Sequence, residues 1–415
     1  MNLPTSDEWA SRCTRDGEFQ LAKRYWTGGL RLRVGNHEIG LRLEDGVLMD
    51  GVPAPGPGVV AFGGDPGVWE QILEASPKRF YNDAMSNVSA GKGLTLEGDR
   101  LAHAQYYAAA MRAIELLRPE ATDGAPLAHD QGTAGRFDAP VGRYVHLELQ
   151  GHDHRIYFEE AGHGIPILLQ HTAGCHGSQW RHLFEFPEIT DRFRLIAYDL
   201  PYHGKSIPPS SKAWWAETYH LRGEFLRSIP LGLSEALGLD RPVFMGCSVG
   251  GLLALDLALH HPDHFRSVIS LEGALHVGGS LEHYGSLWHP QVSNEYKARL
   301  MDGLMAPTSP TAYRKETSFV YASGWPPAFL GDLHYYLEEY DLRDKAGSID
   351  TNAIGVHIFS GEYDYSSTLE MGRAAHSAIK GSTFTEMIGV GHFPMSENPE
   401  AFVEYLRPTL DLIAE

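Results

Sequence analysis

The sequence predicts an α/β protein: a doubly wound, mostly parallel sheet with a helical cap insertion, preceded by a smaller N-terminal α+β domain. Two observations predict this class. From about residue 142 onward, short apolar runs alternate with helical patterns, as expected when parallel strands are joined by helices. Within that region, residues 275–350 contain no clear strand and are rich in aromatic residues, so they read as an insertion into the sheet domain.

The length and the net charge of the chain limit the classes of protein to which it can belong. The chain has 415 residues, and 34 basic against 53 acidic residues give a net charge of −19. This charge repels phosphate backbones and anionic membranes, so we expect neither a nucleic-acid nor a membrane partner. The first residues lack a signal-peptide pattern and no apolar run approaches the ~20 residues of a membrane span, which predicts a cytoplasmic protein. Cys13, Cys175 and Cys247 show no C-x-x-C spacing, so no disulfide framework or zinc site is expected.

Residues 1–118 predict the smaller α+β domain. Apolar residues alternate on both sides of the turn at Gly35-Asn36, which indicates two antiparallel strands. Asp65-Pro66 and Asp99 are helix-start signals, each preceded by a short strand pattern. This order resembles the sterol-carrier-type fold, whose sheet and helices can enclose an apolar tunnel. The alternative is a domain that packs against the rest of the chain or forms a homo-oligomer. No cofactor motif occurs in it.

Residues 119–141 contain several helix breakers and little periodicity, so they predict a linker. Residues 142–415 then form the larger domain, which begins with a hairpin, continues with alternating strands and helices, and carries the cap at 275–350. The expected strands are 144–149, 155–158, 165–170, 195–199, 243–245, 267–271, 356–360 and 384–388. The expected helices outside the cap are 180–193, 219–237, 250–261, 367–379 and 399–413.

A serine stands between the strand at 243–245 and the helix that follows it. The motif Gly246-Cys-Ser-Val-Gly250 fits G-x-S-x-G, in which a sharp turn exposes the serine at the head of a helix. On this motif and its strand-turn-helix context, residues 142–412 resemble the α/β-hydrolase fold family. The resemblance implies that Ser248 is the nucleophile of a catalytic triad.

A serine hydroxyl needs a general base and a group that orients that base. In the family these follow the serine in the order acid, then histidine. Gly361-Glu-Tyr-Asp364 puts Asp364 at the position of the acid, and Gly389-Val-Gly-His392 puts His392 at that of the base. Glu272, at the end of the strand 267–271, is the competing acid, or a residue that contacts the cap or the substrate. Because all three triad candidates follow residue 141, we expect residues 1–118 to be removable without loss of the triad.

The resemblance also implies an oxyanion hole of two backbone N–H groups. Val249, next to the nucleophile, matches one donor, and Ala173 matches the other. The loop around Ala173 departs from the family's His-Gly-x-Pro pattern, since Thr172 and Gly174 replace the glycine and the proline. Thr172 either adds a hydroxyl to the hole or caps the turn. Tyr202 replaces a glycine of the family's Asp-x-Pro-Gly-His-Gly segment and is a candidate pocket residue.

A serine nucleophile predicts acyl chemistry. We expect hydrolysis of a carboxylic ester or lactone, with a bulky apolar or aromatic group that suits the aromatic cap. Hydrolysis of a carbon–carbon bond in a ring-cleavage product is the alternative within the family, and a non-catalytic ligand-binding receptor is the alternative from another class. The cap histidines at 276, 283 and 289 show no metal-ligand spacing, so no metal is expected.

Overall fold

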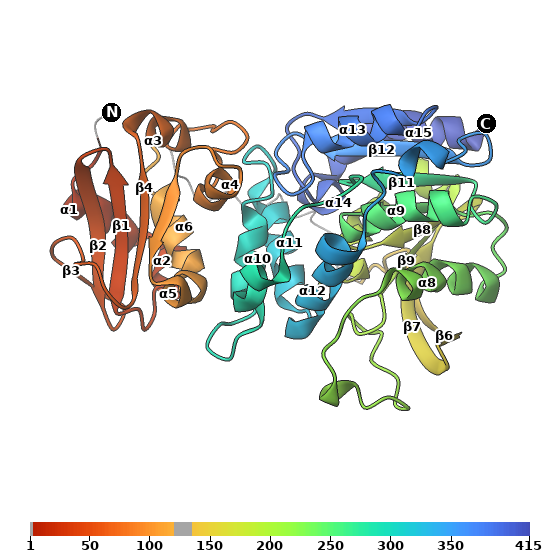
Figure 1. Ribbon diagram of the computed structural model, residues 1–415, viewed down its shortest axis with the longest axis horizontal. Coiled ribbons are helices and arrows are strands. Elements are labelled where there is room, and N and C mark those ends of the chain that lie inside the picture. The colour runs from red at the N-terminus through yellow and green to blue at the C-terminus, as the bar shows by residue number, and fades with distance from the viewer. Residues whose placement is uncertain (1–2, 120–134) are drawn as a thin grey trace. The chain divides into compact units, whose positions relative to one another are not determined.

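The computed structural model describes residues 3–119 and 135–415, which divide into two compact units (Figure 1). The first unit combines the described residues up to 119 with residues 286–308, and the second contains residues 135–285 and 309–415. The segment 286–308 therefore groups with the N-terminal residues, although it lies inside the expected cap at 275–350. Most of the expected linker, residues 120–134, lies outside the described residues.

The first unit contains a five-stranded sheet in the order β3-β2-β1-β4-β5. The two strands around Gly35 pair antiparallel as predicted, whereas β1 and β4 are parallel. The strands are β1 (Gly28–Val34), β2 (His37–Glu44), β3 (Val47–Met49), β4 (Val59–Gly64) and β5 (Thr95–Gly98). Its helices are α1 (Ser6–Arg15), α2 (Gly17–Ala22), α3 (Pro66–Ile72), α4 (Ala84–Ser89), α5 (Arg100–Gln105), α6 (Tyr107–Glu115) and α10 (Glu295–Asp302).

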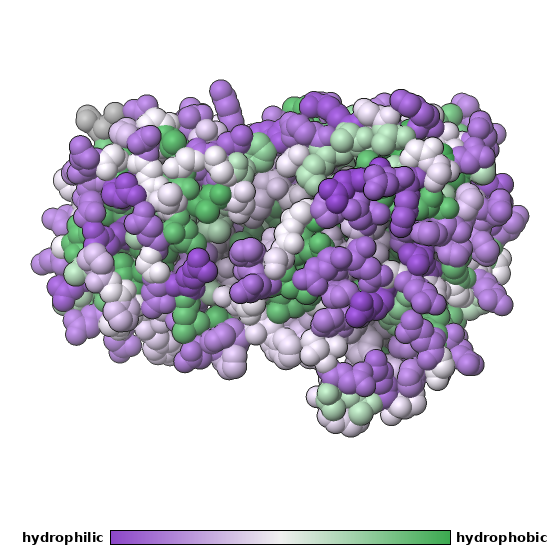
Figure 2. Space-filling model, in the orientation of Figure 1, coloured by the Kyte–Doolittle hydropathy of each residue, from purple (hydrophilic) through white to green (hydrophobic). Residues whose placement is uncertain are grey.

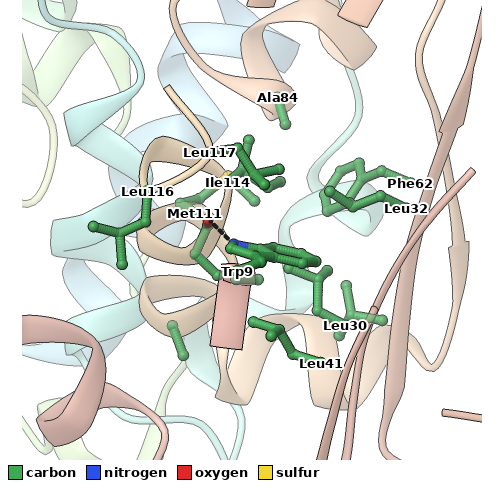
Figure 3. Close-up of a cluster of buried hydrophobic side chains, with 14 of the residues drawn as sticks. Trp9, Leu30, Leu32, Leu41, Phe62, Ala84, Met111, Ile114, Leu116 and Leu117 are labelled. Carbon is green, nitrogen blue, oxygen red and sulfur yellow. Dashed lines mark hydrogen bonds between the residues drawn. The ribbon is translucent and has the colours of Figure 1, made fainter. Parts of the chain in front are cut away.

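An aromatic core holds the first unit together (Figure 3). Trp9 of α1 is fully buried, and its indole N–H donates to the carbonyl of Ala113 in α6 at 2.7 Å. Leu30 and Leu41, on paired strands, face the same cluster. Apolar residues of β1, β2, β4, α1 and α6 thus form one continuous core for this unit.

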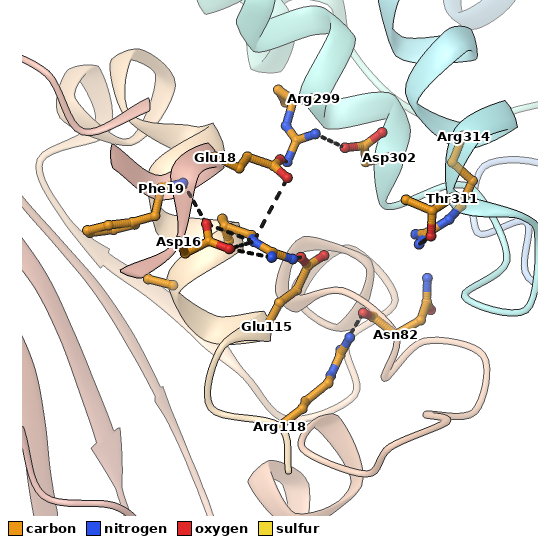
Figure 4. A network of polar contacts seen from close by, with 12 residues as sticks. Asp16, Glu18, Phe19, Asn82, Glu115, Arg118, Arg299, Asp302, Thr311 and Arg314 are labelled. Atoms are coloured by element: carbon orange, nitrogen blue, oxygen red, sulfur yellow. Dashed lines mark hydrogen bonds and ion pairs between the residues drawn. The ribbon is translucent and has the colours of Figure 1, made fainter. Parts of the chain in front are cut away.

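A polar network lies in the same unit (Figure 4). The buried guanidinium of Arg112 contacts Asp16 at 2.5 Å, and Arg299 of α10 forms an ion pair with Glu18. Asn82 donates its amide Nδ2 to the carbonyl of Gly303 at 3.1 Å. These contacts, together with apolar packing by Tyr296, attach residues 286–308 to the N-terminal residues.

The second unit contains an eight-stranded sheet in the order β13-β12-β11-β10-β8-β9-β7-β6. The pairs β6–β7 and β7–β9 are antiparallel. All pairs among β8 to β13 are parallel, which confirms the predicted mostly parallel sheet. The strands are β6 (Val141–Leu149), β7 (His152–Ala161), β8 (Ile165–Gln170), β9 (Phe193–Tyr198), β10 (Val243–Cys247), β11 (Ser267–Leu271), β12 (Gly355–Gly361) and β13 (Thr383–Met387).

Both faces of this sheet are covered. All five residues of β10 are buried, as in a parallel strand between two helical layers. Val243 and Met245 pack with residues of η1 and α15, whereas Phe244 between them points to the opposite face. The helices outside the insertion are η1 (Gly177–Glu185), α7 (Pro187–Thr190), η2 (Trp214–Ala216), α8 (Gly223–Ala236), α9 (Val249–His260), α13 (Leu369–Ala378), α14 (Pro394–Glu397) and α15 (Pro399–Ala414).

The chain between β11 and β12 forms helices and no strand, as expected for residues 275–350. Besides α10, which belongs to the first unit, its helices are η3 (Leu281–Trp288), α11 (Thr311–Ala322), α12 (Pro326–Leu333), η4 (His334–Glu339) and η5 (Ala346–Ser348). The helices from α11 to η5 are part of the second unit. We use the name insertion for residues 275–350.

The surface in view is mostly hydrophilic, with separate apolar areas (Figure 2). Exposed large apolar side chains include Trp215 and Phe319. Among the described residues, no helix is both long and apolar enough to cross a membrane.

Candidate active site

The backbone bends sharply at Ser248, between β10 and α9. Ser248 has φ +59° and ψ −114°, a conformation that costs a residue with a side chain of order 1–3 kcal/mol. Its N–H donates to the carbonyl of Leu271 on the neighbouring strand at 2.9 Å, and its carbonyl accepts from Leu252 N–H at 2.9 Å. The strained residue is thus held on both sides by regular structure.

Gly246 of the motif and Gly251, directly after it, are needed for close packing. A Cβ added to Gly246 would lie 2.4 Å from the carbonyl oxygen of Gly250, and one added to Gly251 would lie 2.2 Å from that of Leu271. Neither position can carry a side chain without backbone movement. The sequence motif therefore reflects the approach of α9 to its own strand and to β11.

Asp364 and His392 lie together at the carboxyl ends of β12 and β13. His392 Nδ1 is 2.6 Å from Asp364 Oδ2, and both side chains are buried. The other oxygen of Asp364 accepts from Ser366 N–H at 2.7 Å. Because a carboxylate only accepts, Nδ1 is the donor in this bond, which leaves Nε2 as the nitrogen that can accept a proton.

Glu272 follows β11, one strand away from Asp364. It is fully buried at φ +50°, and both carboxyl oxygens lie 2.9 Å from Gly361 N–H. Burial, and then the charge of Asp364, raise the pKa of Glu272 well above its usual value. Glu272 thus holds its proton more tightly than a free glutamate, and Asp364 is the carboxyl group that contacts the histidine ring.

Glu272, Asp364 and His392 also form a group whose ligand-type atoms all lie within 4.8 Å of one another. The distance between His392 Nδ1 and Asp364 Oδ2 is 2.6 Å. Two atoms bound at about 2.0 Å to one tetrahedral ion lie about 3.3 Å apart. The separation of 2.6 Å is shorter than this distance between two metal ligands, and it is that of a hydrogen-bonded acid and base.

Two N–H groups flank the serine turn without an acceptor among residues 3–119 and 135–415. They belong to Val249, the first residue of α9, and to Ala173, in the loop after β8. Orphan N–H groups at a helix start are suited to receive negative charge. Gly246 pairs with Gln170 in the β10–β8 register, so both turns leave the same edge of the sheet.

The hydroxyl of Thr172 is engaged within its own turn. It donates to Gln179 Oε1 at 3.0 Å and shares a short hydrogen bond with the hydroxyl of Tyr321. Gln179 Oε1 also accepts Thr172 N–H at 3.0 Å. Of the two roles expected for Thr172, the contacts agree with the one that fixes the turn.

Tyr202 is buried at φ +73° and lines a cavity of about 520 Å³ together with Trp214 and Tyr219. Ser248 is not among the residues that line this cavity. Tyr202 thus lines a cavity to which Ser248, Asp364 and His392 do not contribute.

Three further residues near the site make contacts that the sequence did not predict. The hydroxyl of Tyr336, in η4 of the insertion, lies near Ser248 and shares a hydrogen bond with Ser366 Oγ at 3.1 Å. The Cys247 thiol donates to the carbonyl of His392 at 3.1 Å. Glu397 Oε1 accepts from the N–H groups of Gly391 and Phe393, at 2.6 and 3.3 Å. The histidine loop is therefore held from both sides.

Comparison with known proteins agrees with this geometry. The family model described as alpha/beta hydrolase fold matches residues 165–399, more than half of the chain. A pimeloyl-[acyl-carrier protein] methyl ester esterase of Vibrio vulnificus (strain YJ016) is 24% identical over 266 residues, which cover 60% of this chain and 96% of the relative.

Solved structures show the same fold. An esterase from Thermogutta terrifontis aligns with a TM-score of 0.57 at 21% identity, over 66% of this chain and 100% of its own. The enol-lactonase from Burkholderia xenovorans LB400 aligns with a TM-score of 0.53 at 22% identity, over 65% of this chain and 100% of its own.

Proposed function

The chain belongs to the alpha/beta hydrolase fold family, and from that premise we propose that it is a serine hydrolase that cleaves a carboxylic ester or lactone through an acyl-serine intermediate. The observation that carries the proposal is the Ser248 turn at φ +59° together with His392, whose Nδ1 is bonded to Asp364 at 2.6 Å. The esterases and the lactonase among its relatives and structural neighbours support this class.

In the proposed reaction, His392 Nε2 takes the proton of Ser248 as its Oγ attacks the acyl carbon. The carbonyl oxygen becomes an oxyanion, which accepts from the N–H groups of Ala173 and Val249. His392 then passes the proton to the leaving alkoxide. A water, deprotonated by His392, attacks the acyl-serine and releases the acid and the free serine.

We propose a substrate with a bulky apolar or aromatic group. Tyr336 and Tyr335 are buried aromatic residues of η4, and the hydroxyl of Tyr336 lies within reach of Ser248. Burial of a ring against such side chains contributes about 25 cal/mol per Å² of apolar area. Small acetyl esters should therefore be poorer substrates than aryl or long-chain esters.

A fluorophosphonate probe tests the proposal. Stoichiometric labelling of Ser248, mapped by peptide mass spectrometry, is expected in the wild type. Ser248→Ala should lose labelling and at least ~10³-fold in turnover, because one hydroxyl is removed from a rigid turn. Tight binding of an ester without labelling would instead support a ligand-binding protein on this fold.

A further inference from the structure

The turn that carries Ala173 uses an N–H group that the family pattern does not have. Proline, expected at position 174, has φ near −65° and no N–H. Gly174 instead has φ +60°, and its N–H donates to Asp332 Oδ2 at 2.7 Å. A Cβ at this position would lie 2.7 Å from Phe329 Cβ. Gly174, where the sequence departs from the family pattern, thus binds a residue in α12 of the insertion.

Asp332 collects donors from three segments. Its Oδ2 accepts from Gly174 N–H and lies 2.8 Å from His203 Nε2, while its Oδ1 accepts from the Tyr219 hydroxyl at 3.2 Å. The residue has no exposed surface. A fully buried carboxylate is stable only when it is paired and hydrogen-bonded in this manner.

His203 supplies the countercharge. Its Nδ1 lies 2.9 Å from the carbonyl of Pro201 and its Nε2 2.8 Å from Asp332. Both partners are acceptors, so both ring nitrogens donate and the ring is an imidazolium. The attraction of Asp332 raises the pKa of His203 above its usual value despite the opposing effect of burial. The insertion is therefore joined to the sheet domain by a buried ion pair.

The hydrogen bonds of the turn leave the Ala173 N–H without an acceptor among the described residues. Gln179 accepts Thr172 N–H at 3.0 Å. His171 Nδ1 lies 2.8 Å from the Thr172 carbonyl, and its Nε2 accepts Leu200 N–H, so Nδ1 is the donor. Asp332 accepts Gly174 N–H. Since each peptide unit is planar, fixing the units before and after Ala173 fixes the direction of its N–H.

We propose that Asp332 is a positioning residue for the oxyanion turn, which holds the Gly174 peptide and thereby aims the Ala173 N–H at the reacting carbonyl oxygen. The inference rests on the proposed function and deepens it. The acceptor is carried by the insertion, so the docking of α12 and the geometry of the turn are set together. Asp332 itself touches neither the substrate nor Ser248.

The test compares three variants of the full chain. Asp332→Ser removes the acceptor from reach of Gly174, and Asp332→Asn keeps an oxygen there. Tyr219→Phe, the matched control, removes another hydrogen bond from the same carboxylate but leaves the turn contact. For each variant we would measure kcat and KM for an aryl ester, the rate of fluorophosphonate labelling, and amide hydrogen exchange in a peptide spanning residues 171–176. Circular dichroism checks folding, and Asp332→Ala replaces the serine variant if that does not fold.

Asp332→Ser is expected to lower kcat and the labelling rate by about 10- to 100-fold, less than the loss of a whole oxyanion donor, with KM within about 3-fold and faster exchange in the turn. Asp332→Asn should recover part of kcat, and Tyr219→Phe should stay within about 3-fold of the wild type. A serine variant with wild-type kcat, or with lower kcat but unchanged exchange, would overturn the proposal. If the wild type is neither labelled nor active, the proposed function fails, and hydrogen exchange alone still decides whether Asp332 holds the turn.

Discussion

Asp364 and Glu272 are the two buried carboxyl groups that were candidates for the acid, and their contacts assign them different tasks. Asp364 accepts from the ring at 2.6 Å and from the Ser366 backbone at 2.7 Å. Glu272 instead faces the N–H of Gly361. From the sequence alone both residues were candidates, because they follow adjacent strands. We infer that Asp364 is the acid of the triad and that Glu272 is a buried neighbour whose pKa is raised.

Replacing Asp364 by asparagine should cost about 10⁴-fold in turnover, as the wrong tautomer of the histidine does in the serine-protease triad. Glu272→Gln should stay within about 10-fold, because glutamine has the shape of the protonated acid. Steady-state kinetics on an aryl ester compares the two. The reverse ranking would move the acid to Glu272.

The raised pKa of Glu272 also predicts how stability depends on pH. A carboxyl that holds its proton more tightly in the folded state makes folding less favourable as pH rises from the unfolded pKa of about 4.3 toward the folded one. Asp364, Glu397 and Cys247 surround it, and the charge of the two carboxylates opposes its ionisation. The side chain of Glu272→Gln cannot ionise. The melting temperature of this variant relative to that of the wild type should therefore increase as the pH rises from 5 to 8. A constant difference across this range would show that Glu272 is ionised in the folded protein.

The sequence predicted the positions of some residues of the site and not those of others. Ser248 and His392 sit in motifs whose strand and turn context is local, so their positions in the fold followed directly. The bond from the Cys247 thiol to the carbonyl of His392 spans 145 positions, and no local pattern encodes it. The same holds for Tyr336, whose side chain approaches Ser248 only after the insertion folds back.

Among the secondary-structure elements, strands were easier to predict than helix ends. The helix expected at 180–193 is instead η1 and α7, interrupted before Pro187. The helix expected at 219–237 is the shorter α8, which runs from Gly223 to Ala236 with Pro230 inside it. The first helix, α1, was not predicted, although Thr5 and Glu8 form the capping box that marks a helix start. The spacing of Thr5 and Glu8 is therefore the sequence signal that predicts α1.

The ion pair between Asp332 of α12 and His203 of the sheet domain should weaken at alkaline pH. A histidine with a raised folded pKa contributes stability that is complete below its unfolded pKa of about 6.5 and is lost as pH rises through the folded value. His171 and His176, which face His203, have lowered pKa values and are neutral above pH 6.5 in both states, while Asp199 is an additional acid nearby.

Thermal melts from pH 6.5 to 9 should therefore show a decline in the wild type that is smaller in Asp332→Asn, because the neutral partner no longer holds the imidazolium. Equal slopes for the two proteins would mean that His203 is neutral in the folded state. Tyr219→Phe keeps the ion pair and should follow the wild type.

For the whole molecule, the N-terminal residues and the segment 286–308 fold as one unit. Tyr296 and Leu300 of α10 pack against the core that contains Trp9 and Trp26. Sequence patterns gave the helical character of residues 275–350 but not their partner, because an amphipathic helix does not specify which core covers its apolar face. This arrangement changes what removal of residues 1–118 should do.

A chain that starts at Val141 keeps Ser248, Asp364 and His392 but leaves the apolar side of α10 without its core. We expect it to aggregate, since uncovered apolar side chains in a contiguous patch promote association. The same truncated chain with Tyr296→Ser and Leu300→Ser should remain monomeric in size-exclusion chromatography and be labelled at Ser248 by the fluorophosphonate probe. In the full-length protein the two substitutions should instead lower the melting temperature, because they remove buried contacts. If the unsubstituted truncated chain is monomeric and labelled, the N-terminal residues are not needed to cover α10.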